Sequence, residues 1–143
     1  MPDYEQPDLG ALLADGARVI ARRETPILER HGISMWEYVV LARLDGAGPV
    51  SQATLSTLTR RDPTRLVRHL DELQARGLVT REVDGGDRRR HLVALSASGR
   101  ATLRACRRDI RTMEDELLGM LSRARRDHLR ADLAALLDGE RGS

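Results

Sequence analysis

The feature that most constrains the fold is one stretch, residues 62–96, whose apolar spacing changes partway along. Its first part places Leu66, Leu70 and Leu73 at helical intervals, which predicts an amphipathic helix with one buried face. Gly77 is a typical helix stop, and two short runs rich in Val, Leu and Thr follow it. The stretch therefore predicts a helix followed by a two-stranded hairpin.

The predicted helix also has a recognisable beginning. Asp62 can accept hydrogen bonds from the free amides of the first turn, and Pro63 at the first helical position loses no donor that the helix needs. Thr64, Arg65 and Arg68 point away from the leucine face. The helix therefore keeps a cationic face free for an anionic partner.

The hairpin is predicted from its turn chemistry. Residues 84–87 read Asp-Gly-Gly-Asp and lie between predicted strands at residues 78–83 and 91–95. Three consecutive arginines then fall at or beside the hairpin tip, at Arg88, Arg89 and Arg90.

A short helix is predicted just before this stretch. Ser51 caps residues 52–58, and residues 59–62 join that helix to the next one. Two helices joined this tightly form a helix-turn-helix, whose second helix enters the DNA major groove with its first residues nearest the base edges. Arginine can also read guanine or hold a phosphate. We therefore assign base contacts to Thr64, Arg65 and Arg68, and phosphate contacts to Arg60 and Arg61.

The charge distribution favours the same part of the chain. Residues 60–111 carry fourteen Arg and seven Asp or Glu, a net charge of +7, whereas residues 1–59 sum to −3 and residues 112–143 to −2. A local cationic excess is typical of a phosphate-binding surface, because neutralised phosphates release counterions. On charge alone, a solvated basic face without a partner remains the alternative.

Composition and cysteine usage narrow the class of protein. The chain has 143 residues, 41% of them hydrophobic, with no Phe and one Trp, so its core must be aliphatic, which suits helices. No run approaches the roughly 18 apolar residues of a membrane span, and the amino end does not resemble a signal segment. We expect a mainly α protein in the cytoplasm, with no membrane partner.

Catalytic and metal-binding patterns are not found in the sequence. The four His are scattered without paired spacing, and no nucleophile stands beside a base. Cys106 lies on an apolar stripe, which favours a buried filler over a redox switch. We expect no enzyme activity, no cofactor and no metal.

Amphipathic helices flank the central stretch. The first is predicted over residues 8–31, with a kink or break at Pro26, and Ser34 caps the next, over residues 35–45. Its inward residues are predicted to be Tyr38, Val39, Leu41, Ala42 and Leu44, and those of the helix at 52–58 to be Ala53, Leu55 and Leu58.

The carboxyl third predicts two more helices. Ser96 caps the first, whose apolar stripe runs from Leu103 to Met120, and Ser122 caps the second, which Gly139 ends. The flanking helices, residues 8–31 and 97–138, carry more apolar surface than a small DNA-binding lobe at residues 33–96 can cover. We expect them to cover each other across the twofold axis of a homodimer.

Three motifs, in this order, resemble the winged-helix regulators of the multiple antibiotic resistance regulator (MarR) family. They are Asp62-Pro63-Thr64 at the helix start, LQARGLV at residues 73–79, and DRRRHLVALSASG at residues 87–99, close to the family pattern D-x-R, a strand and L-(T/S)-x-x-G. The resemblance covers about half the chain by motif and nearly all of it by architecture. It implies a mainly α winged helix-turn-helix with a small β wing, in which Asp87 steadies the wing.

The wing and the ligand response follow from the same resemblance. Arg89, with Arg88 or Arg90, is implied to reach the minor groove, where a narrow groove attracts arginine. The family's ligands, often aromatic or phenolic, bind between the winged unit and the dimerisation helices. The candidate residues here are Arg22, Arg23, His31, Met35 and Trp36, although a lone Trp at such a position more often packs against the core than holds a ligand.

The sequence thus predicts a ligand-responsive repressor that binds double-stranded DNA as a homodimer. A twofold dimer sets its recognition helices about one DNA turn, roughly 34 to 36 Å, apart, so the operator should be pseudo-palindromic. The alternative is a helical interaction module whose basic face binds an acidic protein partner.

Overall fold

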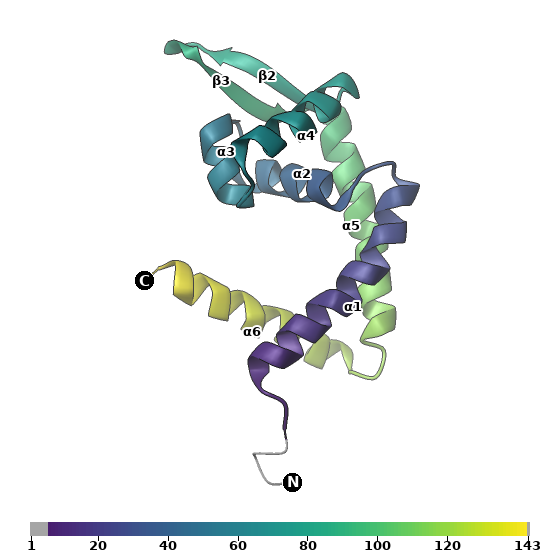
Figure 1. Ribbon diagram of the computed structural model, residues 1–143. Helices are drawn as coiled ribbons and strands as arrows, with labels where there is room; N and C mark the ends of the chain where they lie inside the picture. The colour runs from purple at the N-terminus through teal and green to yellow at the C-terminus, as the bar shows by residue number, and fades with distance from the viewer. Residues whose placement is uncertain (1–5, 143) are drawn as a thin grey trace.

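A computed structural model describes residues 6–142, except for the side chains of residue 84 and residues 87–90. The predicted mainly α fold with a small β wing is confirmed: within these residues there are six helices and one antiparallel sheet, which lies at one end of the molecule (Figure 1). The helices are α1 (Leu9–Arg30), α2 (Met35–Ala47), α3 (Gln52–Thr59), α4 (Pro63–Ala75), α5 (Ala97–Leu117) and α6 (Arg123–Arg141); the strands are β1 (Val50–Ser51), β2 (Val79–Asp84) and β3 (Asp87–Leu95).

All four predicted serine caps are confirmed. Each serine hydroxyl accepts a hydrogen bond from the backbone amide three residues later, and these serines are Ser34, Ser51, Ser96 and Ser122. Ser34 also forms a reciprocal capping box with Glu37. Asp62 occupies the cap position of α4, but its carboxylate makes no cap hydrogen bond.

The prediction at Pro26 is a kink or a break, and the break is wrong, because α1 continues through the proline to Arg30. The two residues after the proline, Ile27 and Leu28, are only 5% and 1% exposed. Burying two such side chains contributes about 1.5–3 kcal/mol each, which offsets the roughly 3 kcal/mol that an internal proline costs a helix. Packing against the core therefore keeps this turn helical.

The winged lobe, residues 33–96, holds α2, α3, α4 and the sheet. The strand order is β1-β3-β2, with Val50 opposite Val93 and Val79 opposite Leu95. The two-residue strand β1 was not predicted. In Figure 1 the long β2–β3 hairpin runs back alongside α4 toward the amino-terminal end of that helix, as a wing beside a recognition helix does.

Among the residues whose burial the structure describes, the core is one mainly aliphatic cluster that begins in α1, fills the winged lobe and continues along α5. The stripe predicted for α4 is confirmed, since Leu66, Leu70 and Leu73 are at most 1% exposed. In α3 only Leu55 of the three predicted inward residues is buried. Ala53 is exposed, and Leu58 faces a hollow of ≈ 640 Å³ that it shares with Leu137 of α6.

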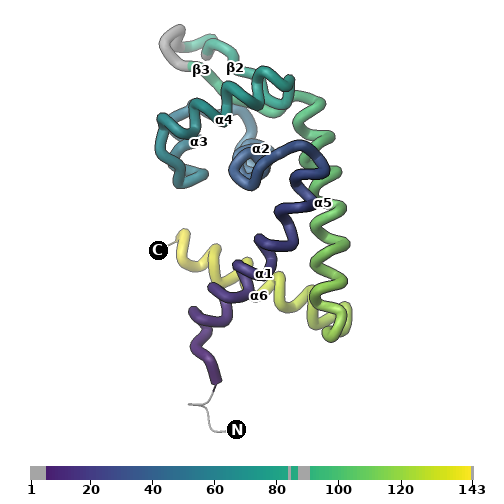
Figure 2. The backbone as a smooth tube through the Cα atoms, turned by 45° about the vertical axis from the view of Figure 1, so that its right-hand side comes forward, coloured from purple at the N-terminus to yellow at the C-terminus, as the bar shows by residue number. Residues whose placement is uncertain are grey.

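The long helix α5 runs from the winged lobe to a turn at residues 118–122, which we call the elbow and which leads into α6. Helix α1 lies beside α5 (Figure 2). Gly99, in the first turn of α5, touches the turn between α4 and β2: a Cβ placed there would collide with the Leu78 carbonyl oxygen. The Ser96 hydroxyl donates to the Gly77 carbonyl at 2.6 Å, so the lobe and the helix are fixed together at this point.

The carboxyl end differs from the prediction in two places. Helix α5 ends at Leu117, so Met120 falls outside the buried stripe and is 84% exposed. Helix α6 continues past Gly139 to Arg141, and none of its residues 123–141, all described, is buried. In residues 6–142, no helix has the length and apolarity that crossing a bilayer requires.

Candidate nucleic-acid interface

The free face of α4 carries the predicted base-contacting residues. Thr64, Arg65 and Arg68 are all exposed, while the opposite face is anchored in the core by its leucines. Neither Arg65 nor Arg68 forms an ion pair with any residue that the structure describes. Both guanidinium groups are therefore free to meet a nucleic acid.

The turn between α3 and α4 is held by its own hydrogen bonds. The Arg61 amide donates to the Ser56 carbonyl at 3.2 Å, and the Ser56 hydroxyl donates back to the Arg61 carbonyl at 2.6 Å. Arg60 adopts a left-handed conformation, with φ of 52°, which is uncommon for a residue with a side chain. This closed turn places the exposed Arg60 just ahead of the recognition helix.

The two arginines of this turn differ in their surroundings. The Arg61 guanidinium lies 4.0 Å from the centroid of the Trp36 ring, and its Nη2 atom is 3.3 Å from His69 Nε2. Such a cation–π contact is favourable when partly desolvated. Arg61 is thus tied to the protein, whereas Arg60 extends into solvent.

The wing is joined to the recognition helix by Arg81 of β2, a residue that the sequence reading missed. Its Nη1 donates to Asp71 Oδ1 at 2.6 Å and to Gln74 Oε1 at 3.3 Å, and its Nη2 donates to the Val67 carbonyl at 3.3 Å. The side chain is only 17% exposed. Arg81 shares the inner face of β2 with buried Val79, and that alternation was the available signal.

The tip of the wing is the Gly85-Gly86 pair, because β3 already begins at Asp87, which pairs with Asp84 at an irregularity of the ladder. The predicted wing residues therefore lie on the strand beside the tip. Their side chains are outside the described part of the structure, and so their predicted roles stay predictions: Asp87, Arg88, Arg89 and Arg90.

The five candidate ligand residues do not share one cavity. Arg22 and Arg23 line a hollow of ≈ 460 Å³ between α1 and α5. His31 hydrogen-bonds Asp109 of that lining at 2.7 Å. Met35 lines a separate hollow of ≈ 390 Å³, and Trp36 is covered by an arginine. The structure therefore brings together only the residues nearest α5.

Cys106 is fully buried on α5, as predicted. Burial raises the pKa of its thiol, and the nearby Asp109 carboxylate raises it further. A protonated, inaccessible thiol is a poor nucleophile. Among the described residues, no group of three or more His, Cys, Asp or Glu is placed to hold a metal ion.

Comparisons with known proteins give one consistent answer. Residues 31–90 match the family model described as the MarR family. The transcriptional repressor NicR of Pseudomonas putida is 30% identical over 123 residues, which cover 83% of this chain and 78% of NicR.

Solved structures with the same fold include regulators of this kind. Apo MarR from E. coli superimposes with a TM-score of 0.80 at 25% identity, covering 92% of this chain and 98% of that one. The transcriptional repressor CouR, bound to a 23-mer DNA duplex, gives 0.77 at 29% identity, covering 91% and 92%. A probable transcriptional regulator from Pseudomonas aeruginosa gives 0.66 at 31% identity, covering 90% and 96%.

Proposed function

This chain belongs to the MarR family of transcriptional regulators, and we propose that it represses transcription by binding a specific double-stranded DNA operator in the cytoplasm. The free face of α4 carries the proposal: Thr64, Arg65 and Arg68 are exposed on a helix whose other face is buried. Two hydrogen bonds from one arginine to guanine discriminate against a wrong base by about 1–3 kcal/mol. Arg60 and the wing arginines, Arg88, Arg89 and Arg90, would contact the backbone and minor groove, and Asp87 would steady the wing.

The exposed apolar surface supports a homodimer. The terminal limb, which we define as residues 9–21 and 123–141, all described, contains no buried residue. Leu9 and Leu12 of α1 are 61% and 54% exposed, and Leu136 and Leu137 of α6 are 47% and 55% exposed. Leucine faces of this extent normally mark an interface. A twofold partner would cover them and pair the two recognition helices on a pseudo-palindromic operator.

A small aromatic acid or phenolate suits the hollow between α1 and α5. Pro26, Ile27 and Met113 supply apolar lining, and Arg22, Arg23 and Arg30 supply positive charge. His31 is held by Asp109 at one side of this hollow, and Met35 and Trp36 stand apart from it. A ligand that binds the DNA-incompetent arrangement better weakens operator affinity only by its preference for that arrangement.

The proposal is tested by selecting bound fragments from genomic DNA with the full chain. We expect an enriched pseudo-palindrome that competes off a bound probe, while random duplex at the same concentration does not. If random duplex and the selected fragments compete equally well, sequence-specific regulation is wrong, and the basic face as a surface for an acidic protein becomes the better explanation.

Single arginine variants then separate the two parts of the interface. Arg65→Ala should lose sequence preference by about 1–3 kcal/mol at one base pair, whereas Arg89→Ala should weaken binding evenly across sequences. Arg125→Ala on α6 removes the same charge far from α4 and serves as the control. Fluorescence anisotropy with the operator and single-base variants measures all three, and parent-like binding by Arg65→Ala contradicts the assignment of α4.

A further inference from the structure

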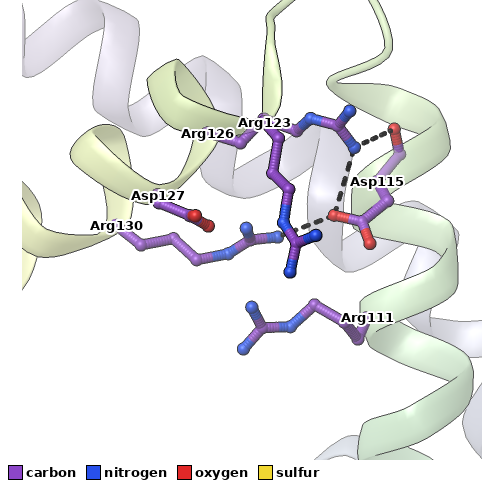
Figure 3. A pocket seen from close by; sticks show the side chains of 6 residues that line it. All are labelled: Arg111, Asp115, Arg123, Arg126, Asp127 and Arg130. Carbon is purple, nitrogen blue, oxygen red and sulfur yellow. Dashed lines mark hydrogen bonds and ion pairs between the residues drawn. The ribbon is translucent and has the colours of Figure 1, made fainter.

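Arginines from two helices meet at the elbow between α5 and α6. They surround a hollow of ≈ 380 Å³ at the end of α5 farthest from the winged lobe (Figures 1 and 3). We call this the elbow site and define it by its lining residues, which are Arg111, Asp115, Arg123, Arg126, Asp127 and Arg130. In Figure 3 the guanidinium groups of Arg111, Arg123 and Arg130 are turned toward the same space.

Two carboxylates of α5 hold some of these arginines in place. Arg130 Nη2 lies 2.9 Å from Glu114 Oε2 and 3.5 Å from Asp115 Oδ1, and Arg126 Nη1 lies 3.4 Å from Asp115 Oδ1. Arg111 Nε is 3.6 Å from the same Glu114 oxygen. A guanidinium has five N–H donors, and these contacts use only a few of them. The carboxylates thus orient the cations without saturating them.

Arg123 has no such partner within the described residues. It is exposed and forms no ion pair there, yet its guanidinium points into the hollow beside that of Arg130. Arg126 Nε is buried and has no hydrogen-bond acceptor among the same residues, although buried donors in proteins normally have one. The elbow therefore has an excess of cationic donors over acceptors.

The start of α6 adds to this excess. Arg123, Arg125 and Arg126 all lie in its first turn, which contains no acidic residue. The helix dipole is positive at that end, so cations there are unfavourable and an anion is favourable. An anion bound between these arginines would relieve both the dipole repulsion and the repulsion between guanidinium groups.

We propose that the elbow site binds a small oxyanion that carries at least two negative charges, such as a diphosphate or a tricarboxylate. Planar guanidinium groups match the geometry of both phosphate and carboxylate oxygens. The carboxylates of Asp115 and Asp127 already compensate part of the positive charge, so a singly charged anion gains little. The site is separate from the recognition face, because the two lie at opposite ends of α5 (Figure 2).

Isothermal titration of the full chain at low ionic strength tests the proposal, with pyrophosphate in one arm and citrate in the other. We expect saturable one-to-one binding per chain in at least one arm, and the arm that binds identifies the phosphate or the carboxylate class. Sodium chloride at matched ionic strength should give no saturable heat. Melting curves with and without each anion should show a matching increase in Tm.

A matched pair of variants locates the site. Arg123→Gln removes the guanidinium that points into the hollow and breaks no ion pair among described residues, so it should weaken binding about tenfold or more, the loss expected when a charge-assisted hydrogen bond disappears. Arg125→Gln removes the same charge from the same helical turn but does not line the hollow, and it should bind like the parent.

Two results would overturn the proposal. One is the absence of saturable binding in both arms. The other is equal weakening by Arg123→Gln and Arg125→Gln, which would mean that only the overall charge of the helix start matters. No DNA enters the experiment, so its outcome is independent of whether α4 reads an operator.

Discussion

The winged lobe and the terminal limb use the same leucine pattern in opposite ways. In α4, Leu66, Leu70 and Leu73 are at most 1% exposed, because the lobe closes a core of its own. In α6, Leu129 and Leu136 repeat that helical spacing but are 40% and 47% exposed. A helical stripe therefore indicates that a face is to be covered, and it does not indicate what covers it. In this chain one stripe is covered from within, and we propose that a second copy covers the other.

The largest effect is expected from truncating a leucine in the lobe. Leu70→Ala leaves a cavity at a fully buried position and should lower the free energy of unfolding by about 2–5 kcal/mol. Chemical denaturation monitored by circular dichroism measures it, and the loss should be the same at every protein concentration, because Leu70 packs within one chain.

The leucine of the limb sharpens the comparison. Leu137→Ala, at a side chain 55% exposed in the single chain, should leave the unfolding of the monomer within about 0.5 kcal/mol of the parent. It should instead shift the dimer toward monomer in sedimentation equilibrium. Loss of stability equal to that of Leu70→Ala at high dilution would show that the limb has an internal core after all.

The next effect tests the point where the lobe meets α5. A methyl group added by Gly99→Ala would collide with the Leu78 carbonyl oxygen, and backbone atoms cannot move aside as a flexible side chain can. We expect a loss of about 3 kcal/mol, at the upper end of overpacking costs.

The matched control is another helical glycine. Gly46 lies inside α2, and a methyl group added there would meet nothing within 4 Å, so Gly46→Ala should be neutral or gain up to about 1 kcal/mol of helix propensity. Thermal melts of both variants give the comparison, and a stable Gly99→Ala would mean that α5 shifts freely against the lobe.

A smaller effect is expected at the brace between wing and recognition helix. Arg81→Ala removes the hydrogen bonds to Asp71, Gln74 and the Val67 carbonyl and should lower stability by about 1–2 kcal/mol, since the side chain is mostly buried. Arg18→Ala breaks an ion pair in the limb whose side chains are 71% and 73% exposed, and it should change stability by less than about 0.5 kcal/mol. If both variants lowered the free energy of unfolding equally in urea denaturation, polar contacts would contribute to stability in the terminal limb as much as in the winged lobe, and the contrast between the two regions would be wrong.

The smallest effect on stability is expected at Glu24, which lies in α1 just after the residues of the terminal limb. Burial raises the pKa of this carboxyl above its ordinary value of 4.5, and the like charge of Glu114 raises it further. An acid whose folded pKa is raised destabilises the ionised protein, so stability falls as pH rises from 4.5 through the raised pKa. Because Glu24 is only half-buried and solvent screens its charge, Glu24→Gln should stabilise the protein by only a few tenths of a kcal/mol at pH 7. Melting curves below pH 4.5 should show that advantage vanish.

Local signals in the sequence were sufficient for most element boundaries. A serine cap depends on atoms three residues apart, so Ser34, Ser51, Ser96 and Ser122 were identified correctly. The break predicted as one alternative at Pro26 does not occur, because the local cost of the proline is smaller than the gain from burying the two residues that follow it, and burial is a property of the whole core. The strand β1 is two residues long, too short to show any period.

For the candidate site too, the features that depend on local sequence were predicted, and those that depend on tertiary packing were not. The exposed positions of α4 follow from the helical period, and the structure confirms that exposure for Thr64, Arg65 and Arg68. The brace formed by Arg81 joins residues ten and fourteen positions apart through side-chain geometry, which a charge pattern does not specify. The five ligand candidates were predicted to line one pocket. Their grouping depends on how α1 lies along α5, which the sequence does not specify, and the structure places them in different surroundings.

The contact between Arg61 and Trp36 gives the protein an intrinsic fluorescent reporter. Trp36 is the only tryptophan of the chain, and its ring lies under the guanidinium of Arg61. Arg61 belongs to the turn that leads into the recognition helix. Indole emission therefore reports on this turn without any added dye. If a phosphate attracts Arg61 when DNA binds, the cation leaves the ring and the emission changes during the titration; if Arg61 keeps its place, the emission stays constant while anisotropy rises. Emission and anisotropy measured in one titration thus show whether Arg61 contacts the DNA or only stabilises the turn before the helix that contacts it.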